Sequence, residues 1–245
     1  MGDCGTKRTG RTLKRHWGRR EYVKRTGAAL AALWLTSACT TTAPVDSDFP
    51  DPAISALPLT IGLQYSDEFR NYVYRDEIPG EPGWVVIMGS ANTTMFDQVI
   101  GGMFEEAIAL EGSGPPSMRV DGVDAIIEPE LESYEFAIPT EWGTNNFTVW
   151  ITYRMNMYRP DGSLIASWPV RAYGESRFQF FKKDESLADA TTMAIRDAGA
   201  YLALYFAEEP KVREWLREEG SRIAASKRRS RGGRSTAPRR RRGAG

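Results

Sequence analysis

"FTVWITYRMNMYRPDG", residues 147–162, carries the strongest structural signal in the chain. Apolar and aromatic residues occupy every second position of residues 147–158, which is the period of a β-strand with one face in the core. Pro160 pre-sets φ and Gly162 supplies conformational freedom, so RPDG predicts a tight turn. Residues 163–178 then return as a second strand. The stretch therefore predicts an antiparallel β-hairpin.

More strands are predicted before the hairpin. Residues 57–66 and the apolar run at 84–89 both have strand composition. Residues 123–139 predict a strand that Pro129 interrupts. In the return strand of the hairpin, Pro169 favours an edge position or a bulge, because proline cannot donate a ladder hydrogen bond.

Two amphipathic stretches predict long helices. The first spans about residues 93–110, and its apolar residues step by three and one. This face contains Phe96, Val99, Ile100, Met103, Phe104, Ala107 and Ile108. The second helix starts near Ser186, and small residues on its inner face allow close approach to a sheet. That face contains Leu187, Ala190, Ala194, Ala198, Tyr201, Leu202 and Tyr205. Pro210 then opens a short helix that stops at Gly220.

The order of these elements predicts an α+β fold. We expect an antiparallel sheet of four to five strands with two long helices packed on one face. The elements occupy residues 57–220, which we expect to form a single domain.

The N-terminal region has the features of an export signal. Eight apolar residues run from Ala28 to Leu35, which is too few for a bilayer span of about 20 helical residues. Lys24 and Arg25 precede them, as in the positive region of a signal peptide. Residues 1–38 therefore predict a signal peptide. A complete signal already begins at Val23, so we expect translation to start there.

The end of this signal, "LTSAC" at residues 35–39, resembles the lipobox of bacterial lipoproteins. Ser37, Ala38 and Cys39 match that pattern, whereas Thr36 stands where the family has an aliphatic residue. The resemblance implies that Cys39 is acylated and becomes the first residue of the mature chain. Thr40 follows it instead of an aspartate, which implies export to the outer membrane, with the protein on its periplasmic face. Residues 39–56, rich in Thr, Pro and Asp, predict a flexible tether.

Charge is segregated along the chain, although the net charge is zero. Residues 1–26 carry nine Lys/Arg and two acids, and residues 221–245 carry ten Lys/Arg and no acid. The part between them carries thirteen Lys/Arg and thirty Asp/Glu. We expect residues 221–245 to be disordered. In the periplasm such a tail would bind lipopolysaccharide phosphates or anionic lipid, or the acidic body itself, and not nucleic acid.

Several kinds of chemistry are excluded once the signal is removed. The only histidine, His16, and the first of two cysteines, Cys4, lie in the leader. The mature chain therefore lacks an imidazole for a nucleophilic triad and the ligands of a His/Cys zinc site. "MGSAN", residues 88–92, lacks the spacing of a phosphate-binding loop. We expect no catalytic residue, no cofactor and no metal.

Two groups of side chains remain as candidates for binding or chemistry. Glu128, Glu130 and Glu132 alternate along a strand, so they would share one face. This is compatible with a glycosidase pair or a divalent-ion site, but a solvated strand face is the favoured interpretation. Trp150 and Tyr158, with Arg154 between them, have the residue types of an interface, but a half-buried sheet face is the favoured interpretation.

Three stretches of the body support a further resemblance: "LPLTIGLQYSDEFR", "TTMFDQVIGGMFEEAI" and "TTMAIRDAGAYLALYF". They are similar to uncharacterised proteobacterial lipoproteins, whose fold resembles the lipopolysaccharide-assembly lipoprotein or the amino-terminal domain of TolB. The resemblance implies a non-enzymatic protein of envelope assembly or transport. Our hypothesis is a lipid-anchored periplasmic adaptor that binds a protein or lipid component. The alternatives are a carboxylate-dependent hydrolase of cell-wall glycan and, without export, a polyanion-binding protein that uses its basic ends.

Overall fold

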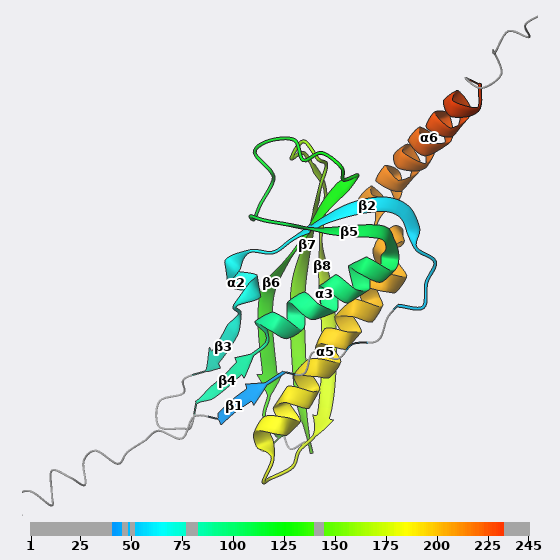
Figure 1. Cartoon of the computed structure of the whole chain (residues 1–245). Helices are drawn as coiled ribbons and strands as arrows, with labels where there is room; N and C mark the ends of the chain where they lie inside the picture. Colours follow the sequence, from blue (N-terminus) through cyan, green and yellow to red (C-terminus); the bar gives the residue numbers. More distant parts are fainter. Residues whose placement is uncertain (1–40, 46–48, 50–51, 77–82, 140–144, 233–245) are drawn as a thin grey trace, which may run out of the picture. The chain divides into compact units, whose positions relative to one another are not determined.

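The computed structural model describes residues 41–45, 49, 52–76, 83–139 and 145–232 (Figure 1). The strands are β1 (Thr41–Pro44), β2 (Leu57–Gln64), β3 (Val73–Asp76), β4 (Trp84–Ile87), β5 (Phe104–Leu110), β6 (Ala125–Ala137), β7 (Asn146–Tyr158) and β8 (Leu164–Arg177). The helices are α2 (Asp67–Arg70), α3 (Gly89–Met103), α5 (Lys183–Tyr205), the 3₁₀ turn η1 (Phe206–Glu208) and α6 (Pro210–Gly232). Cys39, the predicted signal peptide and the expected start at Val23 lie outside the described residues.

The strands form two sheets. A five-stranded sheet has the order β5-β2-β6-β7-β8, and a three-stranded sheet has the order β1-β4-β3. The α+β class is confirmed, but the expected antiparallel sheet is wrong in detail, because β2 runs parallel to both β5 and β6. β2 and β5 can run parallel because α2, β3, β4 and α3 intervene between them, and such a crossover returns the chain in the same direction.

The predicted β7–β8 hairpin is confirmed over its whole length. Register pairs run from Asn146–Arg177 to Tyr158–Leu164. The turn closes through the Arg159 amide, which donates to the Ser163 carbonyl, and Gly162 has a φ of +86°. β8 is an edge strand, as Pro169 favoured. One amide on the free edge of β8 is satisfied by a side chain, because the Tyr173 amide donates a 3.0 Å hydrogen bond to Asp197 of α5. This makes the edge less available for pairing with another strand.

Pro129 does not interrupt its strand, contrary to expectation. β6 continues through it without a break, and Pro129 pairs with Met155 of β7. The parallel ladder between β2 and β6 ends at Ile127. Pro129 lies beyond it, so its missing N–H costs no hydrogen bond to β2.

The first predicted helix is too long by seven residues. α3 ends at Met103, and residues 104–110 form β5 beside β2. Apolar residues at 104, 107 and 108 continue the helical spacing, but Gly101 and Gly102 weaken the helix just before them. The helix also begins earlier than predicted, at Gly89, and has no side-chain cap.

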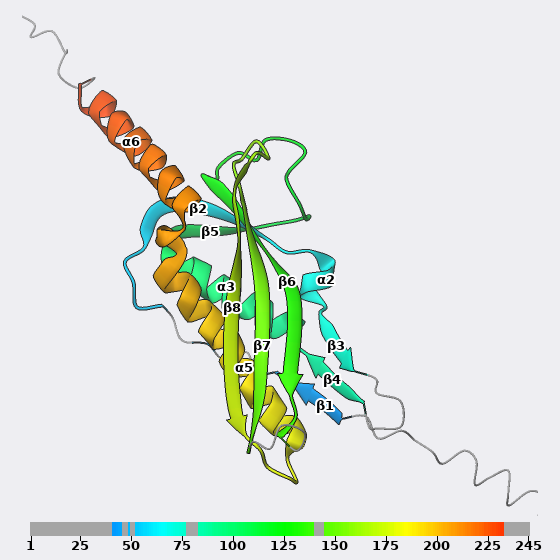
Figure 2. The same cartoon turned by 180° about the vertical axis from the view of Figure 1, so that it is seen from behind.

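α3 and α5 lie on one face of the five-stranded sheet, as predicted (Figure 1). α5 approaches β8 so closely that a Cβ at Gly174 would lie 2.0 Å from the Ala190 carbonyl oxygen and 2.4 Å from the Ala194 amide nitrogen. The predicted inner face of α5 is correct for its buried residues, which are Leu187, Ala190, Ala194, Ala198 and Leu202. Tyr201 and Tyr205 are instead exposed. Among the described elements, no helix covers the opposite face of β6, β7 and β8 (Figure 2).

Both predicted flexible ends are partly folded. The expected tether at 39–56 contains β1, whose four residues pair in parallel with β4, and Ala43 and Phe49 within it are buried. The predicted stop at Gly220 and the disorder of residues 221–245 are wrong as far as Gly232, because α6 continues to that residue. The segment is rich in Arg, Lys, Glu and Ala, which favour helix.

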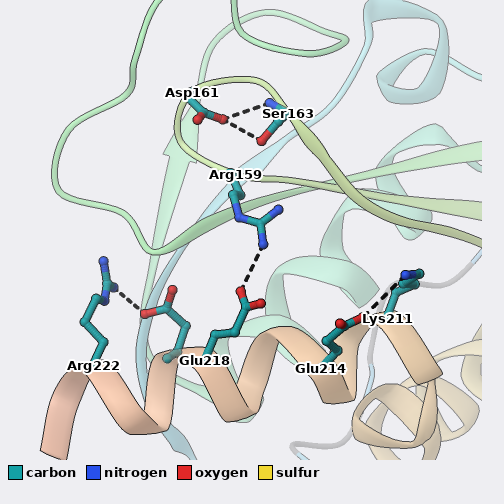
Figure 3. Close-up of polar contacts among 8 residues, drawn as sticks. Arg159, Asp161, Ser163, Lys211, Glu214, Glu218 and Arg222 are labelled. Atoms are coloured by element: carbon teal, nitrogen blue, oxygen red, sulfur yellow. Dashed lines mark hydrogen bonds and ion pairs between the residues drawn. The ribbon is translucent and has the colours of Figure 1, made fainter. Parts of the chain in front are cut away.

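Ion pairs hold α6 against the sheet. Arg159, which follows β7, pairs with Glu218 at 3.0 Å (Figure 3). Arg222 pairs with Asp124, which precedes β6, and with Glu219 on α6 itself. Val212 and Trp215 in the first turns of α6 are buried in the main core. The helix is therefore fixed at its start by apolar packing and farther along by charges.

Candidate functional site: a groove between α3 and α5

The three alternating glutamates do not form one solvated face. Glu128 is only 1% exposed, and its two carboxylate oxygens accept from the Gly114 amide at 2.8 and 2.9 Å. Glu130 accepts a 2.9 Å hydrogen bond from Asn156 Nδ2. Glu132 pairs with Arg154 next to the register shift of β6 between Leu131 and Ser133. Each carboxylate is thus engaged by a different group.

A polar cavity of about 270 Å³ lies beside two of these glutamates. Glu68 of α2, together with Glu128 and Glu130, contributes its acidic lining. Burial, followed by the charge of Glu128, raises the pKa of Glu130 above its usual range. Within the described part of the chain, no cluster of three or more His, Cys, Asp or Glu side chains has the arrangement of a metal site. The surroundings of this cavity therefore account for the raised pKa of Glu130, but its described side chains do not form a metal site.

The aromatic interface candidates are separated by the structure. Trp150 is exposed on the open face of the sheet, with its ring 6.2 Å from the ring of Tyr173 on β8. Tyr158 is buried in a small separate cluster with Val123 and Ile126. Arg154 forms an ion pair with Glu132. The exposed pair is therefore Trp150 and Tyr173, and the alternation of residues along β8 was the signal that could have identified Tyr173.

An apolar opening lies on the other side of the sheet, between the helices. It has a volume of about 310 Å³ and is lined from three parts of the chain. α3 contributes Met95 and Val99, α5 contributes Arg196, Gly199, Ala200, Ala203 and Leu204, and the segment before β2 contributes Phe49, Pro52, Ala53 and Ile54. We call this opening the α3–α5 groove.

Small residues on α5 create the groove. At Gly199 the helices are in close contact, since a Cβ there would lie 3.0 Å from Met95 Sδ and 3.1 Å from Val99 Cγ2. Ala200 and Ala203, which follow on α5, have side chains too short to fill the space above. The short side chains that bring α5 close to its neighbours thus also leave a space beside α3.

The groove has one charged lining residue and an apolar border. The Arg196 guanidinium carbon lies 6.0 Å from the centre of the Phe49 ring, within reach of a cation–π contact. Leu204 and Ile54 line the groove and are themselves exposed. Tyr201 and Tyr205 are exposed on the same helix, with ring centres 4.8 Å apart. Exposed apolar side chains that gather beside a concave surface are typical of a binding site.

Searches for related proteins give structural neighbours only. No protein-family model and no curated protein sequence matches the chain. A Xanthomonas campestris protein of the DUF330 family is similar in structure with a TM-score of 0.45 at 12% identity, over 75% of this chain and 98% of that protein. A minor lipoprotein of Acinetobacter baumannii is similar with a TM-score of 0.38 at 6% identity, over 63% and 94%. A hypothetical protein of Chlamydia trachomatis is similar with a TM-score of 0.36 at 8% identity, over 62% and 100%.

No helix in the described part of the chain combines the length and the apolar character needed to cross a bilayer.

Proposed function

We propose that this protein is a non-catalytic, lipid-anchored adaptor of the bacterial outer membrane. Acylated Cys39 holds the body on the periplasmic face, where it binds a lipid or protein component during envelope assembly or transport. The observation that carries this proposal is the α3–α5 groove, an apolar opening of about 310 Å³ with a single arginine in its lining. We assign to it the acyl chain of an anionic amphiphile.

The lining favours an acyl chain over a polar ligand. Apart from Arg196, its residues are aliphatic, aromatic, proline or glycine, so they offer few groups for orienting a polar molecule. Burial of each methylene of an acyl chain would contribute about 0.8 kcal/mol. A carboxylate or phosphate at the end of the chain would meet the Arg196 guanidinium, whose planar fork of donors matches the oxygens of either group.

The described carboxylates support the non-catalytic part of the proposal. Glu128 holds the loop at Gly114, and Glu132 is paired with Arg154, so neither is presented as a free acid or base. The substitutions Glu128→Gln, Glu130→Gln and Glu132→Gln should therefore leave the phenotype of a strain that depends on this protein unchanged. Loss of the phenotype in these variants, with normal protein levels, would favour the glycan hydrolase.

The groove is tested with a fluorescent fatty acid, 11-(dansylamino)undecanoic acid, and the full chain carrying Cys39→Ser. We expect saturable binding that Ala203→Phe weakens at least tenfold by filling the groove. Ala207→Phe, on an exposed position one turn farther along, is the matched control and should bind normally. Arg196→Gln should weaken binding of the fatty acid more than binding of its uncharged alcohol. Equal binding by both phenylalanine variants would exclude the groove.

The anchor is tested by the mass of the mature N-terminus after expression in a Gram-negative host. We expect a diacylglyceryl-modified Cys39 as the first residue, and its loss in Cys39→Ala. An unmodified N-terminus upstream of Cys39 would contradict the anchor and return attention to the basic ends. The basic residues 221–245 remain, in this proposal, a second site of attraction for lipopolysaccharide or anionic lipid.

A further inference from the structure

The connection between β8 and α5 carries an unusual pair of exposed side chains. Its sequence is FQFFKK, residues 178–183. Phe180 is 66% exposed and Phe181 is 95% exposed, and their rings meet edge to face at 5.2 Å. Phe178, two residues earlier, instead packs against the core. The chain thus directs two adjacent phenylalanines into solvent at the tip of a tight connection, where they stabilise nothing in the described core.

Two lysines follow the phenylalanine pair at this tip. Lys183 Nζ lies 5.1 Å from the centre of the Phe180 ring, and Lys182 pairs with Glu185 at 2.6 Å. Asp184 and Glu185 follow in the first turn of α5, so the local charge is balanced. Apolar burial, and not net charge, would therefore drive an interaction of this tip. Long lysine side chains can still extend to polar headgroups while their stems follow an apolar surface.

Three contacts place this tip at the end of the domain where the described chain begins. Thr41 at the start of β1 is in register with Trp84. The Trp84 ring lies 5.6 Å from the ring of Phe147, at the start of β7. The Phe147 ring in turn lies 5.7 Å from that of Phe178. Figure 2 shows β1 and the turn from β8 into α5 at the same end of the five-stranded sheet.

Covalent geometry restricts the distance to the proposed anchor. Thr41 lies two positions after Cys39, and an extended chain covers roughly 7 Å over that length. With Cys39 in the bilayer surface, the end of the domain that contains Thr41 is held close to the membrane. Phe180 and Phe181, at the same end, then face the bilayer, where amphipathic surfaces bury their apolar residues about 5–10 Å into the interface.

We propose that residues 179–183 form a membrane-inserting loop, in which Phe180 and Phe181 enter the interface of a phospholipid bilayer and Lys182 and Lys183 remain at the headgroups. This inference rests on the proposed lipid anchor for the orientation of the domain. The insertion itself needs no acyl group and is measured without one. Two contacts at one end of the domain would hold it on the bilayer more firmly than either alone.

The test uses the full chain with Cys4→Ser and Cys39→Ser, and one new cysteine for an environment-sensitive nitrobenzoxadiazole label. The label is placed at Phe181→Cys or, as control, at Met118→Cys. Met118 is also highly exposed, at 82%, but it precedes β6, and the length of that strand separates it from the tip by about 40 Å. Vesicles contain phosphatidylethanolamine and phosphatidylglycerol, with nitroxide groups on the acyl chains.

We expect the label at position 181 to shift to the blue and to lose at least half of its intensity to the nitroxides, whereas the label at 118 stays unquenched. The basic tail can bring the chain to the vesicles but would not distinguish the two labels. Phe180→Ser with Phe181→Ser should lower vesicle binding several-fold at high salt, where attraction of the tail is screened. Equal quenching at 181 and 118, or no vesicle binding, would overturn the insertion. The insertion and the anchor can fail separately, because the mass of the N-terminus decides only the latter.

Discussion

The hydroxyl of Tyr153, on β7, donates a 2.8 Å hydrogen bond to Asn92 Oδ1, on α3, and both side chains are completely buried. The bond joins the centre of the sheet to the first turns of the helix that lines the groove. Asn92 Nδ2 has no partner among the described residues, so the bond from Tyr153 to Oδ1 is the hydrogen bond that satisfies this side-chain amide. Burial raises the pKa of Tyr153 well above its usual range, and the hydroxyl therefore remains a donor.

Removing one partner of this bond should be costly. Tyr153→Phe leaves the Asn92 amide buried without a donor, and we expect the free energy of unfolding to fall by about 1–3 kcal/mol. Replacing both partners, as Tyr153→Phe with Asn92→Leu, should recover most of the loss because no polar atom then remains unpaired. Urea denaturation of both single variants and of the double variant measures this. Additive losses in the double variant would contradict the pairing.

The contact between α5 and β8 predicts a second effect. Gly174→Ala places a methyl group against the Ala190 carbonyl and the Ala194 amide, which belong to the helix backbone and cannot rotate away. Because this overpacks the contact, we expect the free energy of unfolding to fall by about 1–3 kcal/mol. Gly101→Ala is the matched control, because a Cβ there meets nothing within 4 Å. It should stabilise α3 by about 0.5–1 kcal/mol, and thermal unfolding of both variants separates the two cases.

Glu130 predicts a pH-dependent effect. Its pKa is higher in the folded chain than in the unfolded chain, so the folded state disfavours its ionised form. This penalty is fully present above the folded pKa and disappears as the pH falls through that value to below about 4.3. Glu130→Gln keeps an acceptor for Asn156 and should stabilise the protein at pH 7, by less than about 1 kcal/mol.

The same substitution should have no stabilising effect below pH 4, where the native glutamate is protonated. Denaturation at pH 7 and at pH 4 measures the difference. Glu132→Gln is the comparison, since it removes the ion pair with Arg154 and should not stabilise the protein at either pH. A loss of stability in Glu130→Gln at pH 7 would show that the carboxylate charge is needed.

The ion pairs of α6 predict a local effect. Arg222 pairs with both Asp124 and Glu219, and burial raises the pKa of Glu219, which the Arg222 charge counteracts. Arg222→Met should destabilise the docked part of α6 by up to about 1 kcal/mol and leave the core unchanged. Hydrogen exchange should then be faster in residues 216–223 and unaltered in β7. Lys211→Met removes an exposed pair with Glu214 and serves as the control.

Local sequence patterns predicted the elements that depend on local interactions. The β7–β8 hairpin combined a two-residue period with a turn that needs Gly162, and the structure confirms both the strands and the turn. The small residues of α5 predicted that this helix approaches the sheet closely. Gly174 of β8 lies at the contact, where a Cβ would meet the α5 backbone. Tertiary pairing was harder to predict. Residues 104–110 fit a helix by spacing, and only their position beside β2 makes them a strand.

The groove and the exposed loop depend on what surrounds each residue. Tyr201 and Tyr205 follow the helical spacing of a core face, yet the neighbouring Leu202 and Phe206 occupy the buried positions and both tyrosines remain exposed. Ala200 and Ala203 indicate helix packing in a sequence, and only the separation of α3 from α5 turns them into a groove wall. Phe180 and Phe181 stand next to each other before two lysines, and this is visible in the sequence. They belong to neither a strand period nor a helix period, so periodicity alone does not identify them.

β1 gives the proposed anchor a mechanical role. This strand has four residues and runs parallel to β4, with its start toward Cys39. When the membrane and the body are pulled apart along the strand axis, tension enters at Thr41 and is shared by the whole short ladder instead of opening one hydrogen bond after another. The small sheet would then bear the load between the lipid and the core.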